Sequence, residues 1–262
     1  MDYTLNVHGQ LLDMSRPLVM GILNATPDSF YADSRQQTEE DVALCCDRIM
    51  TEGAAMIDVG GCSTRPGGEV ATEAQEMERL RTALTVIRRK QPDAILSIDT
   101  FRPDVARMAV EEFGADIIND VSGGTPEMFR MVTRLRVPYI LMSLQPTMRD
   151  MLLSFAEKVQ QLRDMGANDI ILDPGFGFGK TLDQNYEIMS ELEKLQVMEL
   201  PLLVGISRKS MIYRSFDCTP KEALNGTTAL NTIALMKGAT ILRVHDVKEA
   251  VECVKIVEKL NC

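Results

Sequence analysis

Short apolar runs recur along the chain, and each is followed by a polar or glycine-rich turn and then by a segment with helical periodicity. The runs are rich in Ile, Leu and Val and lack clean alternation, which is typical of parallel strands covered on both faces. We predict strands at Leu18–Asn24, Ala55–Gly61, Ala94–Thr100, Asp116–Ser122, Tyr139–Leu144, Asp169–Gly175, Leu202–Ser207 and Ile241–Asp246. Helices are predicted between them, for example at Glu39–Met50, Ala74–Lys90, Pro103–Phe113, Phe155–Met165 and Leu224–Met236.

Eight successive strand–helix units predict an α/β fold with right-handed crossovers. The length of 262 residues is close to the roughly 250 residues of a (β/α)8 TIM barrel. We therefore expect a closed barrel, with an open, doubly wound sheet as the alternative. Before the first strand, Tyr3–Met14 predicts a β-hairpin that closes the barrel bottom, with His8 as a turn residue. No Ser/Pro-rich or charge-rich linker is found, which favours a single domain over residues 1–262.

The charge balance narrows the class of partner. The net charge of −10 argues against nucleic acid and anionic membranes, although a local basic cluster is still able to bind a small anion. Six cysteines without a Cys-x-x-Cys pair, and only two histidines, favour free thiols in a reducing cytosol over a structural zinc site. The sequence has neither a signal-peptide pattern nor an apolar run of about 18 residues. We expect a cytoplasmic protein with no membrane partner.

A polar or sulfur-containing side chain stands near the carboxyl end of every predicted strand. In a barrel these ends converge on one mouth, where active sites form. A single member such as Asp99 has an alternative role as a helix cap, but a complete set indicates a functional site. The set is Asn24, Asp58, Asp99, Asn119 with Asp120, Met142, Asp173, Lys209, and Arg243 with His245.

Seven motifs at these strand ends resemble those of the dihydropteroate synthase family, in the family's order, from about Val19 to Val247. They are Gly21–Phe30 (GILNATPDSF), Asp58–Gly67 (DVGGCSTRPG), Ser97–Thr100 (SIDT), Ile118–Gly124 (INDVSGG), Leu172–Lys180 (LDPGFGFGK), Gly205–Ser210 (GISRKS) and Arg243–Val247 (RVHDV). The resemblance implies a pterin-binding TIM barrel that condenses 6-hydroxymethyl-7,8-dihydropterin diphosphate with p-aminobenzoate in folate biosynthesis and releases pyrophosphate. It also implies Mg²⁺ as cofactor, a homodimer and a sulfonamide target.

The resemblance assigns the pterin to Asp99, Asn119, Met142, Asp173 and Lys209. Their chemistry agrees, because an ionised Asp173 only accepts hydrogen bonds and suits the donor edge of the ring, whereas Lys209 suits its carbonyl or ring nitrogens. Met142 is able to pad one face of the ring. Asp99 is also expected to stabilise positive charge on the pterin during the reaction.

The resemblance places the pyrophosphate against Arg65, Arg243 and His245, and arginine matches phosphate oxygens bidentately. The alternative for Arg243 and His245 is an ion-pair cluster with Asp246. Mg²⁺ usually takes one or two protein ligands beside phosphates, a role that Asn24 fits.

The p-aminobenzoate site is expected to combine an aryl slot with a carboxylate partner. Phe178 and Pro66 form the slot, Phe30 closes it, Thr64 frames it and Ser210 meets the carboxylate. The segments Thr26–Gln37 and Ser63–Ala71 are expected to be loops that close over the substrates. The expected catalytic residues are Asp99, Lys209 and, as a contact to metal or cation, Asp33. We predict mainly electrostatic catalysis without an acid/base dyad.

The sequence departs from the family after the fifth strand, where Ser143 stands in place of a histidine and the loop is short. A working enzyme with a trimmed loop is favoured over a paralogue with weakened catalysis. Three further alternatives are a pterin-binding barrel that passes a methyl group to a corrinoid protein, a Schiff-base aldolase using Lys209, and a non-catalytic pterin-binding barrel. The apolar stretches Met236–Ala239 and Val247–Val257 fit either a dimer face or the core.

Overall fold

A computed structural model describes residues 3–26, 35–62 and 70–260 of the chain. Its main feature is an eight-stranded parallel sheet in which each strand pairs with its neighbour in the sequence. The strands are β3 (Leu18–Asn24), β4 (Met56–Gly60), β5 (Ile95–Asp99), β6 (Ile117–Asp120), β7 (Tyr139–Met142), β8 (Ile170–Asp173), β9 (Leu203–Val204) and β10 (Ile241–Val244).

The sheet closes on itself. On one side β10 pairs with both β3 and β9. Between β8 and β9 the closure is a single parallel bridge, Leu172 to Leu202, beside a backbone hydrogen bond of 2.9 Å from Leu172 to Pro201. This ring confirms the predicted TIM barrel over the open sheet.

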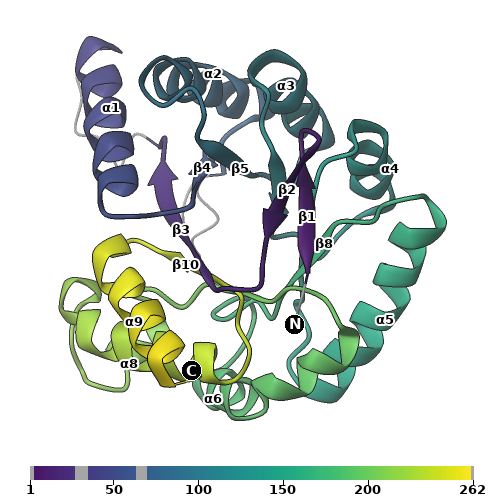
Figure 1. The fold of residues 1–262 in the computed structure, drawn as a ribbon, viewed down its shortest axis with the longest axis vertical. Coiled ribbons are helices and arrows are strands. Elements are labelled where there is room, and N and C mark those ends of the chain that lie inside the picture. The colour runs from purple at the N-terminus through teal and green to yellow at the C-terminus, as the bar shows by residue number, and fades with distance from the viewer. Residues whose placement is uncertain (1–2, 27–34, 63–69, 261–262) are drawn as a thin grey trace.

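The helices surround the barrel (Figure 1). They are α1 (Arg35–Thr51), α2 (Glu73–Lys90), α3 (Pro103–Phe113), α4 (Pro126–Leu135), α5 (Met148–Asp164), α6 (Leu182–Ser190), α7 (Ser210–Tyr213), α8 (Leu224–Met236) and α9 (Val247–Leu260), with 3-10 helices η2 (Leu192–Met198) and η3 (Pro220–Glu222). The main core lies between these helices and the outer face of the sheet. In the described part of the chain, no helix is long and apolar enough to cross a membrane.

Two predicted helices, α3 and α8, have the predicted bounds. Others begin earlier than predicted: α1 begins at Arg35, not Glu39, and α5 begins at Met148, not Phe155. The α5 start is explained by Thr147, whose side chain caps the backbone N–H of Asp150 at 3.2 Å. Because α1 extends to Arg35, the end of the predicted loop Thr26–Gln37 is helical.

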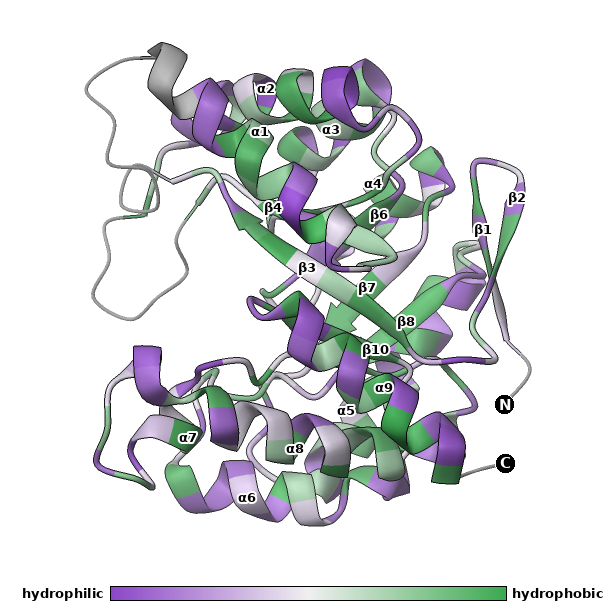
Figure 2. Ribbon diagram, turned by 60° about the vertical axis from the view of Figure 1, so that its left-hand side comes forward, coloured by the Kyte–Doolittle hydropathy of each residue, from purple (hydrophilic) through white to green (hydrophobic). Residues whose placement is uncertain are grey.

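The bottom of the barrel is closed by a hairpin, as predicted, formed by β1 (Thr4–Val7) and β2 (Gln10–Asp13). His8 and Gly9 form its two-residue turn with φ values of +48° and +82°, the backbone of a tight hairpin turn. Figure 2 shows the hairpin on the side of the barrel toward which both chain ends point. Leu5, Val7 and Met14 pack into a second apolar cluster inside the barrel.

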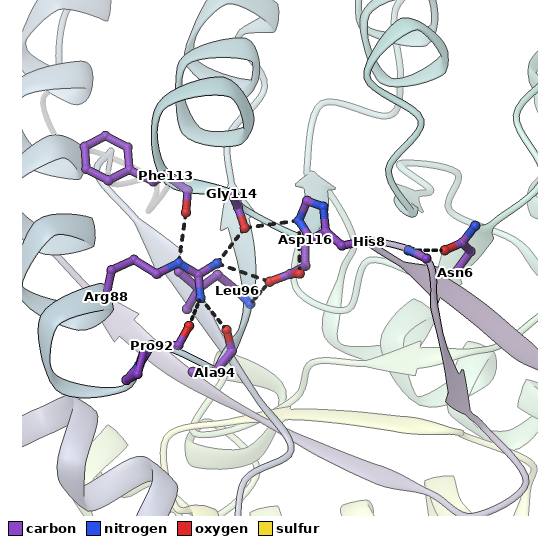
Figure 3. Close-up of polar contacts among 10 residues, drawn as sticks. Asn6, His8, Arg88, Pro92, Ala94, Leu96, Phe113, Gly114 and Asp116 are labelled. Atoms are coloured by element: carbon purple, nitrogen blue, oxygen red, sulfur yellow. Dashed lines mark hydrogen bonds and ion pairs between the residues drawn. The ribbon is translucent and has the colours of Figure 1, made fainter.

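The hairpin is also held by polar contacts (Figure 3). His8 Nε2 lies 3.2 Å from Oδ1 of Asp116 and 3.2 Å from the carbonyl oxygen of Gly114. The other carboxylate oxygen of Asp116 accepts from the backbone N–H of Leu96 at 2.7 Å and lies 3.4 Å from Arg88. His8 is thus a structural residue of the barrel bottom.

The barrel interior consists of layers. The bottom layer is apolar and contains Met20, Met56, Ile117, Ile140, Ile171, Leu203 and Ile241. Since side chains alternate along a strand, the residue two positions later points to the same side. Those next positions are Ile22, Asp58, Asn119, Met142, Asp173, Gly205 and Arg243. Two residues further along these strands, the interior therefore changes from an apolar layer to a layer that contains four polar or charged side chains, Asp58, Asn119, Asp173 and Arg243.

Candidate active site

Arg243 of β10 joins the carboxylates of two other strands. Its Nε donates to Oδ2 of Asp58 at 2.6 Å, and an Nη donates to Oδ2 of Asp99 at 2.7 Å. Nδ2 of Asn119 donates to the same Asp58 oxygen at 3.2 Å. The four side chains come from β10, β4, β5 and β6, so residues far apart in the sequence share one site as predicted.

Two oxygens in this cluster lack a hydrogen-bond partner within the described residues: Oδ1 of Asp58 and Oδ1 of Asn119. Both residues are buried, with exposed fractions of 0% and 1%. An unpaired buried acceptor is costly. Both oxygens are therefore suited to accept from a ligand with N–H donors. Asp58 was recognised at a strand end but received no role in the sequence prediction, although it is central to the cluster.

Burial raises the pKa of Asp99 to about 7, while the charge of Arg243 acts in the opposite direction. Asp58 and Glu76 add to the rise, because neighbouring negative charges disfavour a further one. Any positive charge that develops beside Asp99 stabilises its ionised form. The site therefore contains a carboxylate whose charge responds to the charge of a ligand.

Asp173 and Lys209 lie close enough for each to act on the pKa of the other. Oδ1 of Asp173 accepts from the backbone N–H of Gly175 at 2.7 Å. Nζ of Lys209 donates to the carbonyl of Phe176 at 2.5 Å and lies 4.6 Å from the ring centre of Phe178. The charge of Arg243 lowers the pKa of both Asp173 and Lys209, so the residues predicted to bind the pterin lie near a residue predicted to bind the pyrophosphate.

Burial lowers the pKa of Lys209 to about 8. The carboxylates of Asp173 and Asp99 act against this shift, but burial outweighs them. The two carboxylates thus oppose the lowering of the Lys209 pKa without cancelling it. Arg208, the neighbour of Lys209 in the chain, is paired with Asp246 at 2.7 Å.

This pairing also corrects the alternative role of Arg243. Arg208 donates to both carboxylate oxygens of Asp246, at 2.8 and 2.7 Å, whereas Arg243 pairs with Asp58 and Asp99. An ion pair between Arg243 and Asp246 is thus contradicted.

Asp120 also differs from the mouth set predicted at the strand ends. It accepts from the hydroxyl of Tyr139 at 2.7 Å and from the backbone N–H of Ser122 at 2.7 Å. Tyr139 packs edge-on against Phe129 of α4, which places Asp120 on the outer side of the sheet. Alternation along β6 thus sends Asn119 into the site and Asp120 away from it.

The remaining predicted residues that the structure describes occupy the strand ends or the segments that follow. Asn24 is the last residue of β3, Met142 is the last of β7, and Ser210 begins α7 directly after Lys209. The backbone N–H of His245 donates to Oγ of Ser207 at 3.2 Å. Phe30, Asp33, Thr64, Arg65 and Pro66 lie outside the described residues.

The connection after β7 is short, as expected, since α5 begins at Met148. Ser143, at the position where the family has histidine, is buried, and its hydroxyl accepts from the backbone N–H of Gln145 at 3.2 Å. Lys180, to which the sequence prediction gave no role, donates to the Ser143 carbonyl at 3.0 Å. The cysteines at 45, 46, 62, 218 and 253 are free thiols, as expected.

Comparisons with known proteins agree with this geometry. The family model of the pterin binding enzymes matches residues 20–245. A dihydropteroate synthase of Escherichia coli (strain K12) is 38% identical over 266 residues, covering 95% of this chain and 94% of the relative. The relative from Bacillus subtilis (strain 168), also a dihydropteroate synthase, is 38% identical over 94% of this chain and 89% of its own.

Solved structures agree as well. The Xanthomonas albilineans dihydropteroate synthase with 4-aminobenzoic acid matches with a TM-score of 0.93 and 32% identity, covering 100% of this chain and 99% of that one. The Yersinia pestis dihydropteroate synthase in a sulfonamide drug complex matches with a TM-score of 0.90 and 37% identity, covering 99% of each chain. These findings favour the synthase over the methyl-transfer and aldolase alternatives. The chain belongs to the pterin-binding enzyme family, within its dihydropteroate synthases.

Proposed function

We propose that the polar layer at the barrel mouth is the active site in which this chain performs the dihydropteroate synthase reaction of folate biosynthesis. The reaction joins 6-hydroxymethyl-7,8-dihydropterin diphosphate to p-aminobenzoate and releases pyrophosphate. We further propose that one domain over residues 1–262 carries this activity.

The pterin is proposed to occupy the space bounded by Asp58, Asn119, Met142, Asp173 and Lys209. The unpaired oxygens of Asp58 and Asn119 suit the amino and ring N–H donors of the pterin. Lys209 would exchange the Phe176 carbonyl for an acceptor on the ring. Met142 is fully buried at the end of β7 and offers a polarizable contact to the ring face.

The pyrophosphate is proposed to bind Arg243 and His245, joined by Arg65. The bonds of Arg243 to Asp58 and Asp99 use Nε and one Nη nitrogen. Its second Nη group donates to no side chain of the described residues and is proposed to bind a phosphate oxygen. A charged donor of this kind stabilises the leaving group as negative charge collects on it.

The donor set fits Mg²⁺ held mainly by substrate. No group of three or more His, Cys, Asp or Glu within residues 3–26, 35–62 and 70–260 forms a metal cage. Asn24 offers one amide oxygen at the mouth, beside Gly60, where a Cβ would lie 3.8 Å from Asn24 Oδ1 and 3.7 Å from Asp99 Oδ2. A single oxygen ligand suits a cation that also binds phosphates and water. When bound there, Mg²⁺ would neutralise charge on the departing pyrophosphate.

Asp99 and Lys209 are the proposed catalytic residues of the described chain, with Asp33 as a further proposed contact to metal or cation. As the bond from the methylene carbon to the pyrophosphate oxygen breaks, positive charge spreads into the pterin ring. Asp99 would stabilise that charge, and Arg243 would stabilise the negative charge on the leaving group. The amine of p-aminobenzoate then forms the C–N bond and loses a proton.

The p-aminobenzoate is proposed to lie over Phe178, with Ser210 at its carboxylate and with Phe30, Thr64 and Pro66 completing the slot. Phe178 lies beside Lys209, and Ser210 follows Lys209 directly in the chain. The aryl slot would therefore adjoin the pterin pocket. The bound 4-aminobenzoic acid in the Xanthomonas albilineans structure supports an aryl carboxylate as second substrate.

The observation that carries this proposal is that two buried oxygens of the polar layer, Oδ1 of Asp58 and Oδ1 of Asn119, lack a hydrogen-bond partner among the described residues. Two matched variants test the proposal. Asn119→Ala should raise the KM for the pterin diphosphate by about tenfold or more. Asn231→Ala is the control, because Asn231 of α8 is also buried and also has an unpaired Oδ1. The assay is pyrophosphate release that requires the pterin diphosphate, p-aminobenzoate and Mg²⁺ together. No release by the wild-type chain, or equal effects of both variants, would contradict the proposal.

A homodimer through α8 and α9 is proposed as the assembly. Ile233 and Met236 of α8 are 40% and 66% exposed, and Ile256 of α9 is 58% exposed, whereas Val247 and Val257 belong to the core. The apolar stretches thus divide between core and surface. Light scattering after gel filtration should give twice the chain mass, and a monomer at micromolar concentration would refute the dimer.

A further inference from the structure

The turn after β8, residues 175–178, is held by two half-buried lysines, Lys180 and Lys209. Lys209 donates to the carbonyl of Phe176 at 2.5 Å. Lys180 donates to the carbonyls of Gly175 at 3.0 Å and Phe178 at 3.3 Å. The turn carries Phe178, whose ring lies under the Lys209 ammonium.

Lys180 also connects this turn to the shortened connection after β7. Its third hydrogen bond goes to the carbonyl of Ser143 at 3.0 Å, and the backbone N–H of Ser143 donates to the backbone carbonyl of Asp173 at 2.8 Å. An ammonium group has three N–H donors, and all three are used here by backbone carbonyls. Lys180 is therefore committed to fixing the backbone and has no donor left for a substrate.

The backbone here is closely packed as well as hydrogen-bonded. Gly175 has φ +67°, and a Cβ at this position would lie 2.3 Å from the Ser143 carbonyl oxygen. Asn185, which is 2% exposed, donates to the carbonyl of Thr181 at 2.7 Å and accepts from the N–H of Gly177 at 2.7 Å. The turn and the backbone of Ser143 are thus packed tightly together and cross-linked by hydrogen bonds.

We propose that Lys180 is a positioning residue for the aryl half of the active site, acting through the 175–178 turn. This inference rests on the proposed function, in which Lys209 leaves the Phe176 carbonyl to bind the pterin. Once Lys209 has moved, three described side chains still hold the turn: Asp173 at the N–H of Gly175, Asn185 at the N–H of Gly177, and Lys180 at the carbonyls of Gly175 and Phe178. Of these, Lys180 is the one that binds the backbone of Phe178 itself. Lys180 then keeps the Phe178 ring in place while p-aminobenzoate binds and reacts.

Burial also lowers the pKa of Lys180 to about 8, against the charge of Asp173. A neutral amine has two N–H donors and a lone pair, so it can serve only two of the three carbonyls. The hold on the turn is therefore weakened as the pH rises through about 8.

The test compares Lys180→Met with Lys237→Met. Lys237 lies at the end of α8, remote from the mouth, and bridges the Ser190 carbonyl and Glu193 at 2.8 and 2.6 Å. Lys180→Met should raise the KM for p-aminobenzoate by about tenfold or more and change the KM for the pterin diphosphate by less than about threefold. Lys237→Met should leave both values unchanged, and Lys180→Arg should recover part of the loss.

A second readout does not depend on turnover. Amide hydrogen exchange of residues 175–179, measured with a pterin bound, should be faster in Lys180→Met than in the wild type, with no such change in Lys237→Met. The positioning role would be overturned if Lys180→Met and the wild type had equal KM values for p-aminobenzoate. It would also be overturned if Lys180→Met raised the KM values for p-aminobenzoate and for the pterin diphosphate to the same extent. If the wild type released no pyrophosphate but the exchange result held, the proposed function would fail while the hold of Lys180 on the turn stood.

Discussion

Arg243 and Asp99 are 144 positions apart in the sequence, yet the arginine donates to the carboxylate at 2.7 Å. The pair joins the last strand of the barrel to β5. It brings the residue proposed to bind the leaving pyrophosphate next to the residue proposed to stabilise positive charge on the pterin. Without substrate, Arg243 and Asp99 form an ion pair. With substrate bound, Arg243 would instead interact with the pyrophosphate and Asp99 with the pterin.

Replacement of Asp99 by Asn keeps the shape but removes the charge. We expect turnover to fall by at least about a hundredfold, because stabilisation of developing charge is a large catalytic term, with little loss of pterin affinity. Single-turnover kinetics and equilibrium pterin binding measure the two effects separately. Unchanged turnover would refute the catalytic role.

Lys209 should give activity and stability opposite dependences on pH. Because its folded-state pKa is about 8 rather than 10.5, the cation is lost as the pH rises through 8, and kcat/KM for the pterin diphosphate should fall. Between pH 8 and about 10.4 the unfolded state binds more protons at this lysine, so stability should rise. Denaturant unfolding of wild type and Lys209→Met across this window isolates the effect. A wild type that gained no stability relative to the variant would contradict the shifted pKa.

Arg88 should stabilise the barrel without affecting catalysis. Its guanidinium donates to four carbonyls, those of Phe113, Pro92, Ala94 and Gly114, and lies in the bottom cluster of Figure 3. Arg88→Ala should lower the free energy of unfolding by about 3 kcal/mol, with kcat unchanged.

The adjacent Arg89 is the control for Arg88. It is 62% exposed in its side chain and 3.7 Å from Glu39, so Arg89→Ala should cost no more than about 0.5 kcal/mol. Urea unfolding measures both variants. Similar losses would show that the cluster at the barrel bottom has no special role.

Two glycines with similar positive φ angles, Gly175 and Gly179, should respond differently to alanine. Gly179 has φ +63° and no atom within 4 Å of a Cβ, whereas a Cβ on Gly175 would overlap the Ser143 carbonyl. Gly179→Ala should cost about 1 kcal/mol from strain alone, and Gly175→Ala at least about 2 kcal/mol more. Thermal unfolding and the KM for p-aminobenzoate test this contrast. If both variants lost the same stability, the turn would be able to shift away from the Ser143 carbonyl without cost.

The sequence predicted the barrel because its strands are continuous apolar runs, a pattern that depends on burial from both sides. It also predicted the mouth, since the carboxyl ends of parallel strands must meet. The run Asn119–Asp120 did not reveal which residue faces inward, because both are polar. Pairing with Asp58 on one side and Tyr139 on the other decides it.

Other features depend on contacts that no local pattern shows. The starts of α4 and α6 carried recognisable signals, Thr125 before a proline and Thr181 three residues before Gln184. The role of Lys180 had no such signal, because its partners are backbone carbonyls from two loops. The Arg208–Asp246 pair could not be predicted either. The sequence contains two candidate arginines, Arg208 and Arg243, and does not show which of them contacts the aspartate.

The wall of the barrel is uneven around its circumference. Between β8 and β9 a single bridge joins the strands, and β9 itself has two residues. A wall with few ladder hydrogen bonds opens at lower free energy than the rest. Thermal fluctuations should therefore separate the barrel first between β8 and β9, with Asp173 on one side of the opening and Lys209 on the other. The most easily deformed part of the barrel wall would then be the part proposed to bind the pterin.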